Sequence, residues 1–158
     1  MTVQPKLTTW DDNMNDVRRY LFNDEILKDL MLLPEESREN IVDFRDKYFV
    51  LGETADEVLR DEDVRIVYYT SEPHEIENKV FKHYLEMDIY VRKNRLYDVD
   101  RDRLKRRDVA IFERIHYLLT CRKHICRMSF RLSSNFDASL KTIGYKRYHC
   151  AFSYYTTH

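Results

Sequence analysis

The chain has 158 residues, of which 43% are hydrophobic and 35% charged, and its formal net charge is −1. This length and composition predict one globular domain that can fold without a metal or a disulfide. No run of about 20 apolar residues occurs, so we expect no membrane span. The first residues also lack the basic and then apolar layout of a signal peptide. An odd number of cysteines (Cys121, Cys126 and Cys150) indicates reduced thiols and a cytoplasmic location.

The charge is distributed unevenly along the chain. Residues 1–63 carry 17 acids and 8 bases, whereas residues 64–158 carry 19 bases and 11 acids. Such a chain can pair head to tail with copies of itself, or present a basic face to nucleic acid. The alternative is that the two parts neutralise each other within one fold.

The N-terminal third, residues 1–63, is predicted to be helical and acidic. Apolar residues recur at helical spacing over 16–22 and 26–31, and again over 41–49. We expect Asn23 or Asp24 to cap the second helix and Pro34 to end this region. Gly52 ends the third helix, and an acidic connector follows over 53–63.

Residues 64–158 form the predicted sheet-and-helix core of the same domain. Strands are expected over 64–70, 81–93, 128–132 and from about 145, with an exposed loop over 71–79. A helix is expected over 101–120, capped by Asp100 or Asp102. The predicted fold is therefore α+β, with a mainly antiparallel four-stranded sheet (β-β-α-β-β) and helices on one face. The other face is either solvated or covered by another subunit.

Few residue patterns indicate catalysis or cofactor binding. Two glycines exclude a Gly-rich phosphate loop. Four side chains could meet a metal, but their spacing fits no standard zinc site: Cys121, His124, Cys126 and His149. His149 and Cys150 are neighbours on a strand and point to opposite faces, which excludes a nucleophile pair. A nucleophile pair of Cys121 with His116 or His124 remains an open alternative. We expect no cofactor.

Glu86 and Asp88 share one strand face, so we compare their spacing with that of the acids in metal-dependent nucleases. Such enzymes often place an acid two residues before a lysine, so that carboxylates hold a cation. No lysine follows two residues after either acid here, and Tyr90 occupies that position after Asp88. A solvated strand face with cross-strand ion pairs is the alternative.

The stretch over 91–108 is the most unusual segment, with eight bases and four acids. Interleaved aspartates repel phosphate and weaken a simple DNA-binding interpretation. We expect this segment to form salt bridges between subunits, with weak tracking of DNA as a second role. The alternative is that it is a solvated segment that leads into the helix. Tyr and Arg dominate interface energetics, so the interface or DNA-lumen candidates are Tyr84, Tyr90, Arg92, Arg95, Arg101, Arg103, Lys105, Arg106 and Arg107.

Three stretches carry a resemblance to a known family. They are EMDIYVRKNRLYD at 86–98, DRLKRRDVAIFERIHYLL at 102–119 and TIGYKRYHCAFSYYTT at 142–157. Together they resemble the neck and tail-completion proteins of long-tailed bacteriophages, in particular the tail terminators. The resemblance covers residues 64–157, and the helical N-terminal third does not match it.

The resemblance implies a virion structural protein without enzymatic activity. In that family an α+β subunit forms a hexameric ring that caps the tail tube and docks to the head connector. The implied partners are copies of the chain, connector or adaptor proteins, the tail tube protein, and DNA passing through the lumen without sequence specificity. The implied location is the virion neck, after assembly in the host cytoplasm. The alternatives are a head-closure or adaptor protein of the same neck, a DNA-binding accessory protein, and a small metal-dependent nuclease.

Overall fold

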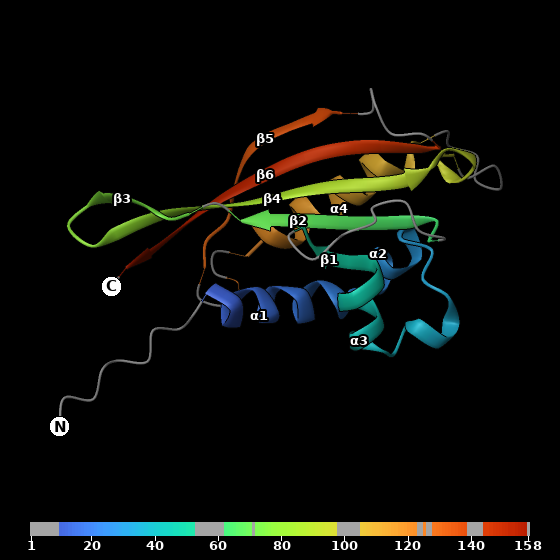
Figure 1. The fold of residues 1–158 in the computed structure, drawn as a ribbon, viewed down its shortest axis with the longest axis horizontal. Coiled ribbons are helices and arrows are strands. Elements are labelled where there is room, and N and C mark those ends of the chain that lie inside the picture. Colours follow the sequence, from blue (N-terminus) through green and yellow to red (C-terminus); the bar gives the residue numbers. More distant parts are fainter. Residues whose placement is uncertain are drawn as a thin grey trace.

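The computed structural model describes residues 10–52, 62–70, 72–97, 105–122, 125, 128–138 and 144–157 (Figure 1). These residues form four α-helices, which are α1 (Trp10–Phe22), α2 (Glu25–Leu30), α3 (Ile41–Asp43) and α4 (Arg107–Thr120). They also form six strands, which are β1 (Phe49–Leu51), β2 (Val64–Thr70), β3 (His74–Glu77), β4 (Val80–Arg92), β5 (Arg131–Asp137) and β6 (Tyr145–Thr157).

The strands make one mixed sheet in the order β1-β2-β4-β6-β5, with β3 paired to β4. Strand β1 runs parallel to β2, and the other pairs are antiparallel. The α+β class is therefore confirmed, but the expected four-stranded antiparallel sheet is wrong. Strands β1 and β3 are the two additions, and both are short.

The centre of the sheet is the long pairing of β4 with β6. Their register runs without interruption from Val80 opposite Thr157 to Arg92 opposite Tyr145. Because side chains alternate along a strand, Leu85, Met87, Ile89 and Val91 share one face. They are fully buried, and Phe152 of β6, which pairs with Leu85, faces the same way.

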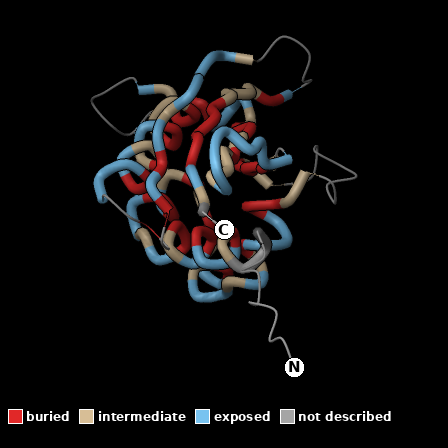
Figure 2. The backbone as a smooth tube through the Cα atoms, turned by 90° about the vertical axis from the view of Figure 1, so that its left-hand side faces the viewer, coloured by how far each residue is buried: buried red, intermediate tan, exposed pale blue. Residues whose placement is uncertain are grey.

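All of the longer helices pack on this face of the sheet. One hydrophobic cluster joins Val17 and Leu21 of α1, Leu27 of α2, and Ile111 and Ile115 of α4 to the inward-facing strand residues. Figure 2, which faces the β3 end of the molecule, shows the buried segments gathered inside a surround of exposed ones. The core thus draws on both the acidic N-terminal part and the basic C-terminal part.

The opposite face of the sheet is not simply solvated. Val67, Tyr90 and Tyr145 form a second buried cluster there, with Tyr69 packed against it. The side chain of Arg65 is also buried on this face, at 2% exposure. Gly52 borders the cluster, where an added Cβ would lie 2.1 Å from the Tyr69 ring. The centre of this face is therefore covered within the chain.

The N-terminal third is helical in part. Asp24 caps α2, as expected, and accepts a hydrogen bond from the Leu27 N–H. Leu32 follows α2 with φ at +55°, a left-handed position that usually holds glycine. The segment expected as a third helix divides into α3, a π-helical turn over Phe44–Tyr48 and strand β1. The prediction of a helical N-terminal third is therefore confirmed only in part, because β1 is a strand.

Two boundaries after β4 also differ from expectation. Helix α4 begins at Arg107, and its N-cap residue Arg106 makes no side-chain cap. The expected caps Asp100 and Asp102 lie outside the described residues. Strand β5 starts at Arg131, whereas Met128 and Phe130 are buried just before it. No described helix has the length and apolar character required to cross a membrane.

Candidate functional site

The described part of the basic run is largely paired within the chain. At the end of β4, Arg92 and Arg95 each place Nε near a carboxylate oxygen of Asp63, at 3.5 and 3.4 Å. Arg92 also donates to the Tyr145 hydroxyl at 3.2 Å. Asp63 belongs to the acidic part of the sequence, so this contact neutralises charge between the two parts of one chain.

The bases before α4 have separate intrachain partners. Lys105 pairs with Glu113. Arg106 donates to both carboxylate oxygens of Asp108, and also to Asp137 of β5 at 3.0 Å. These bonds, above all those to Asp108, raise the pKa of Arg106. Arg107 is buried and donates to the carbonyls of Arg95 and Leu30, at 2.9 and 3.1 Å.

The remaining candidates differ in accessibility. Arg101 and Arg103 lie outside the described residues. Tyr84 is half-buried on the outer sheet face, beside Lys82. Tyr90 was expected on an exposed face, which is wrong, because it is 4% exposed and packs in the second cluster. Burial raises the pKa of Tyr90, and the hydrogen bond from Arg147 opposes that rise.

The acids considered for a nuclease lie beside a histidine. His149 Nδ1 is 2.8 Å from Asp88 Oδ1, and His149 Nε2 is 3.7 Å from Glu86 Oε1. These three side chains share the outer face, as strand alternation predicted. Asp88 is 8% exposed, which leaves little room around its carboxylate. Within the described ranges, no group of three or more His, Cys, Asp or Glu side chains could hold a metal ion.

The cysteines differ in their surroundings. Cys121 is exposed at the end of α4, and Cys150 is buried in the core face of β6. Burial raises the pKa of the Cys150 thiol to about 12, so it is not a thiolate nucleophile at neutral pH. Cys126 and His124 lie outside the described residues.

The outer part of the β3–β4 hairpin is exposed, which confirms the expected exposure of its described residues. The expected loop over 71–79 is wrong in part, because His74–Glu77 form strand β3. Residues 72–79 are all exposed, and the hairpin extends beyond the helices at one end of the molecule (Figure 1). Asn78 and Lys79 connect the strands, both with positive φ, which is the geometry of a type I′ turn. Ile76, at a register shift in β3, exposes 55% of its surface. We call residues 72–80 the arm.

Strand β5, at one end of the sheet order, is an open edge. Strand β5 pairs only with β6, and every residue of it except half-buried Leu132 is exposed. Phe136 exposes 53% of its surface while its ring lies 4.9 Å from the His149 ring. Unpaired N–H and C=O groups on such an edge can accept a strand from another chain.

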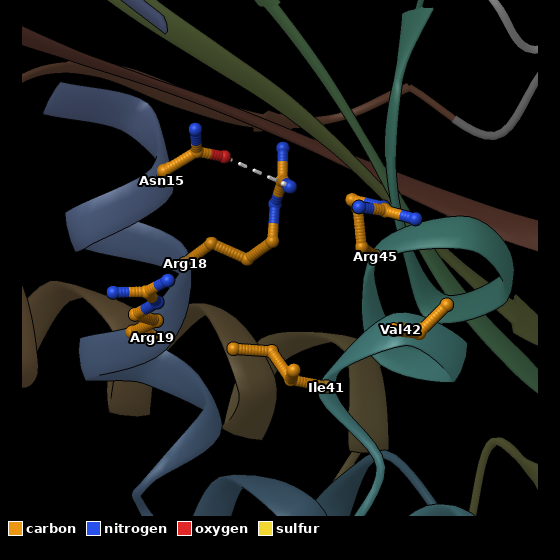
Figure 3. Close-up of a pocket in the computed structure, with 6 residues that line it drawn as sticks. All are labelled: Asn15, Arg18, Arg19, Ile41, Val42 and Arg45. Atoms are coloured by element: carbon orange, nitrogen blue, oxygen red, sulfur yellow. Dashed lines mark hydrogen bonds between the residues drawn. The ribbon is translucent and has the colours of Figure 1, made fainter. Parts of the chain in front are cut away.

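A basic pocket lies between α1 and the α3 turn. Its volume is about 180 Å³, and it is lined by Asn15, Arg18, Arg19, Ile41, Val42 and Arg45 (Figure 3). We call it the arginine pocket. Arg18 is 9% exposed and donates to the Asn15 Oδ1 at 3.2 Å and to the Tyr68 hydroxyl. Arg45 is held by Asp46, with Nε 2.7 Å from Oδ1.

Two of the three guanidinium groups in this pocket lack an acidic partner among the described residues. No carboxylate there lies within salt-bridge distance of Arg18 or Arg19, and no hydrogen-bond acceptor contacts Arg18 Nε. This pocket could not be predicted from the sequence, because Arg45 lies 26 positions beyond Arg19 in a different helix. The only available signal was the Arg18-Arg19 pair on an otherwise acidic segment.

No protein-family model matches the chain, and the search of curated proteins found no match either.

Proposed function

We propose that this protein is a virion structural protein of the head–tail neck of a long-tailed bacteriophage. Its copies form a ring, which acts as a tail terminator by capping the tail tube and joining it to the head connector. A head-closure or adaptor role in the same neck is the nearest alternative. The chain acts by assembly without catalysis, first in the host cytoplasm and then in the virion.

The projecting arm is the observation that carries this proposal. The arm extends the sheet, because Val80, Phe81 and Lys82 of β4 pair with β3 on one side and with β6 on the other. Strand β3 pairs with β4 alone, and none of residues 72–79 is buried. Ile76 leaves 55% of its surface exposed near the tip. An arm of this kind is best explained as a contact surface for a neighbouring molecule.

The sheet supplies a second surface of the required kind. A ring forms when two different surfaces of a subunit meet at each contact and the rotation closes. The arm is built on β3, which pairs with β4, whereas the open edge belongs to β5, which ends the strand order on the other side of β6. A chain with distinct and separated contact surfaces suits this heterologous mode of assembly.

The paired basic run favours assembly over a DNA-binding accessory role. Five described candidates in this run already contact carboxylates or carbonyls of the same chain, so their charge is partly neutralised. Free DNA binding draws on arginines and lysines that are available to phosphate. A lumen through which DNA slides needs a weakly attractive wall, and this mixed charge is consistent with that requirement.

The assembly part of the proposal predicts closed rings of the purified protein. Particle mass measured over a concentration series should rise from one subunit to a single closed species, of about six subunits by analogy with the resembling family. Negative-stain electron microscopy of the same sample should show rings with a central hole. Open chains of unlimited length, or discrete dimers, would contradict ring closure.

A further inference from the structure

The arginine pocket carries more positive charge than the described residues around it neutralise. Three guanidinium groups line it, and Asp46 balances the one on Arg45. Arg18 is nine-tenths buried, and the contacts that hold it are neutral oxygens of Asn15 and Tyr68. Asp46 attracts Arg18 only from beyond salt-bridge distance. A buried charge without an adjacent opposite charge is costly, and a carboxylate that enters such a site forms strong, charge-assisted hydrogen bonds.

The walls of the pocket indicate which kind of carboxylate suits it. Ile41 and Val42 supply apolar surface, and Val42 is 49% exposed. Arg19 and Arg45 are exposed at the rim of the pocket, whereas the positively charged side chain of Arg18 is buried. A fitting ligand would therefore place an acid beside a short aliphatic group, as a Glu-Ile-Glu peptide does.

The arm of this same chain has that sequence. Glu75, Ile76 and Glu77 lie in β3 next to the turn, and all three are exposed. Glu75 accepts a hydrogen bond from the Lys79 N–H at 3.2 Å, which holds its carboxylate at the tip. Glu77 makes no ion pair among the described residues. The charge and the apolar content of the arm tip complement those of the arginine pocket.

We infer that the arm of one copy docks into the arginine pocket of the next copy, with Glu77 facing the arginines and Ile76 against Ile41 and Val42. This inference depends on the proposed self-assembly and names its contact. The contact joins two different surfaces, so it is heterologous and can be repeated around a ring. It also assigns a partner to the buried charge of Arg18.

A charge exchange between the two surfaces tests the inference. Glu77→Arg and Arg19→Glu alter exposed side chains, so both variants should fold, which circular dichroism and thermal unfolding will verify. Each single variant should weaken self-association by about tenfold or more, measured by sedimentation velocity up to the solubility limit. The double variant has the net charge of the original chain, and it should recover most of the lost association.

Matched controls change the same charge elsewhere. Glu36 and Lys93 lie on exposed 3₁₀ turns and belong neither to the arm nor to the pocket lining, so Glu36→Arg and Lys93→Glu should leave association unchanged. The inference is overturned if the single variants assemble as the original chain does, if the double variant shows no recovery, or if the original chain stays monomeric. In each of these cases the neck proposal is judged separately, by locating the chain in virus particles.

Discussion

Arg106→Ala should lower the free energy of unfolding by about 3 kcal/mol, because it leaves the fully buried carboxylate of Asp108 without its cation. Asp108 is 0% exposed, and Arg106 Nη2 lies 2.6 Å from its Oδ2. The same guanidinium reaches Asp137 Oδ2 at 3.0 Å, and so it also holds strand β5 to the start of α4. Urea unfolding followed by circular dichroism measures this loss.

The comparison variants for Arg106 separate charge from packing. Lys105→Ala removes a neighbouring cation whose partner Glu113 is 52% exposed, so it should cost less than about 1 kcal/mol. Adding Asp108→Asn to Arg106→Ala removes the stranded charge and should recover part of the loss. Equal stability of the Arg106→Ala and Lys105→Ala proteins would show that the buried carboxylate does not depend on Arg106.

Asp24→Ala should give the second large loss, of about 2 to 3 kcal/mol. Asp24 Oδ2 accepts the Leu27 N–H at 2.8 Å as the N-cap of α2. The same carboxylate accepts two hydrogen bonds from Arg114, at 2.9 and 2.6 Å, and thereby joins α2 to α4. Asp24→Asn keeps an acceptor for the cap and loses the ion pair, so its free energy of unfolding should lie between those of the original chain and the Asp24→Ala variant.

The Asp24 carboxylate also makes stability depend on pH. Burial alone would raise its pKa, but the hydrogen bonds from Arg114 and Leu27 outweigh burial and hold the pKa below the ordinary value of 3.8. A group with a depressed pKa contributes stability that is present above its unfolded pKa and is lost as pH falls through the folded pKa. The stability gap between the original chain and Asp24→Asn should therefore be largest near neutral pH and close in acid.

The control for this pH dependence is Asp46→Asn. Asp46 is 54% exposed beside Arg45, and solvent screens such a pair, so its removal should change stability by less than about 1 kcal/mol. Unfolding free energies measured from neutral pH down to the acid range compare the two variants. A gap for Asp24→Asn that stays constant through that range would rule out the carboxylate as its source.

Sequence periodicity located the elements that are long and strongly patterned. Strand β4 alternates apolar and polar residues over 13 positions, and α4 carries an apolar stripe, so both were predictable. Strand β1 could not be predicted, because three residues are too few to show a period. Its parallel partner β2 also begins 13 positions later. The polar sequence and Pro73 concealed β3, which is stabilised by its pairing with β4.

The surfaces depended on contacts that sequence spacing does not reveal. Tyr90 follows Glu86 and Asp88 on a polar face, but Val67 and Tyr145 come from other strands to bury it. Asp24 meets Arg114 across 90 positions, so the charge asymmetry of the sequence is partly neutralised inside the fold. The arginine pocket likewise forms only when α1 packs beside the α3 turn.

The neck proposal is tested most directly by locating the chain in virus particles. Antibody raised against the purified protein, coupled to gold and imaged by electron microscopy, should label particles produced from the genome that encodes the chain. We expect one gold cluster at the junction of head and tail. Gold confined to the capsid, gold at the distal tail tip, or no label on intact or detergent-opened particles would contradict the neck role.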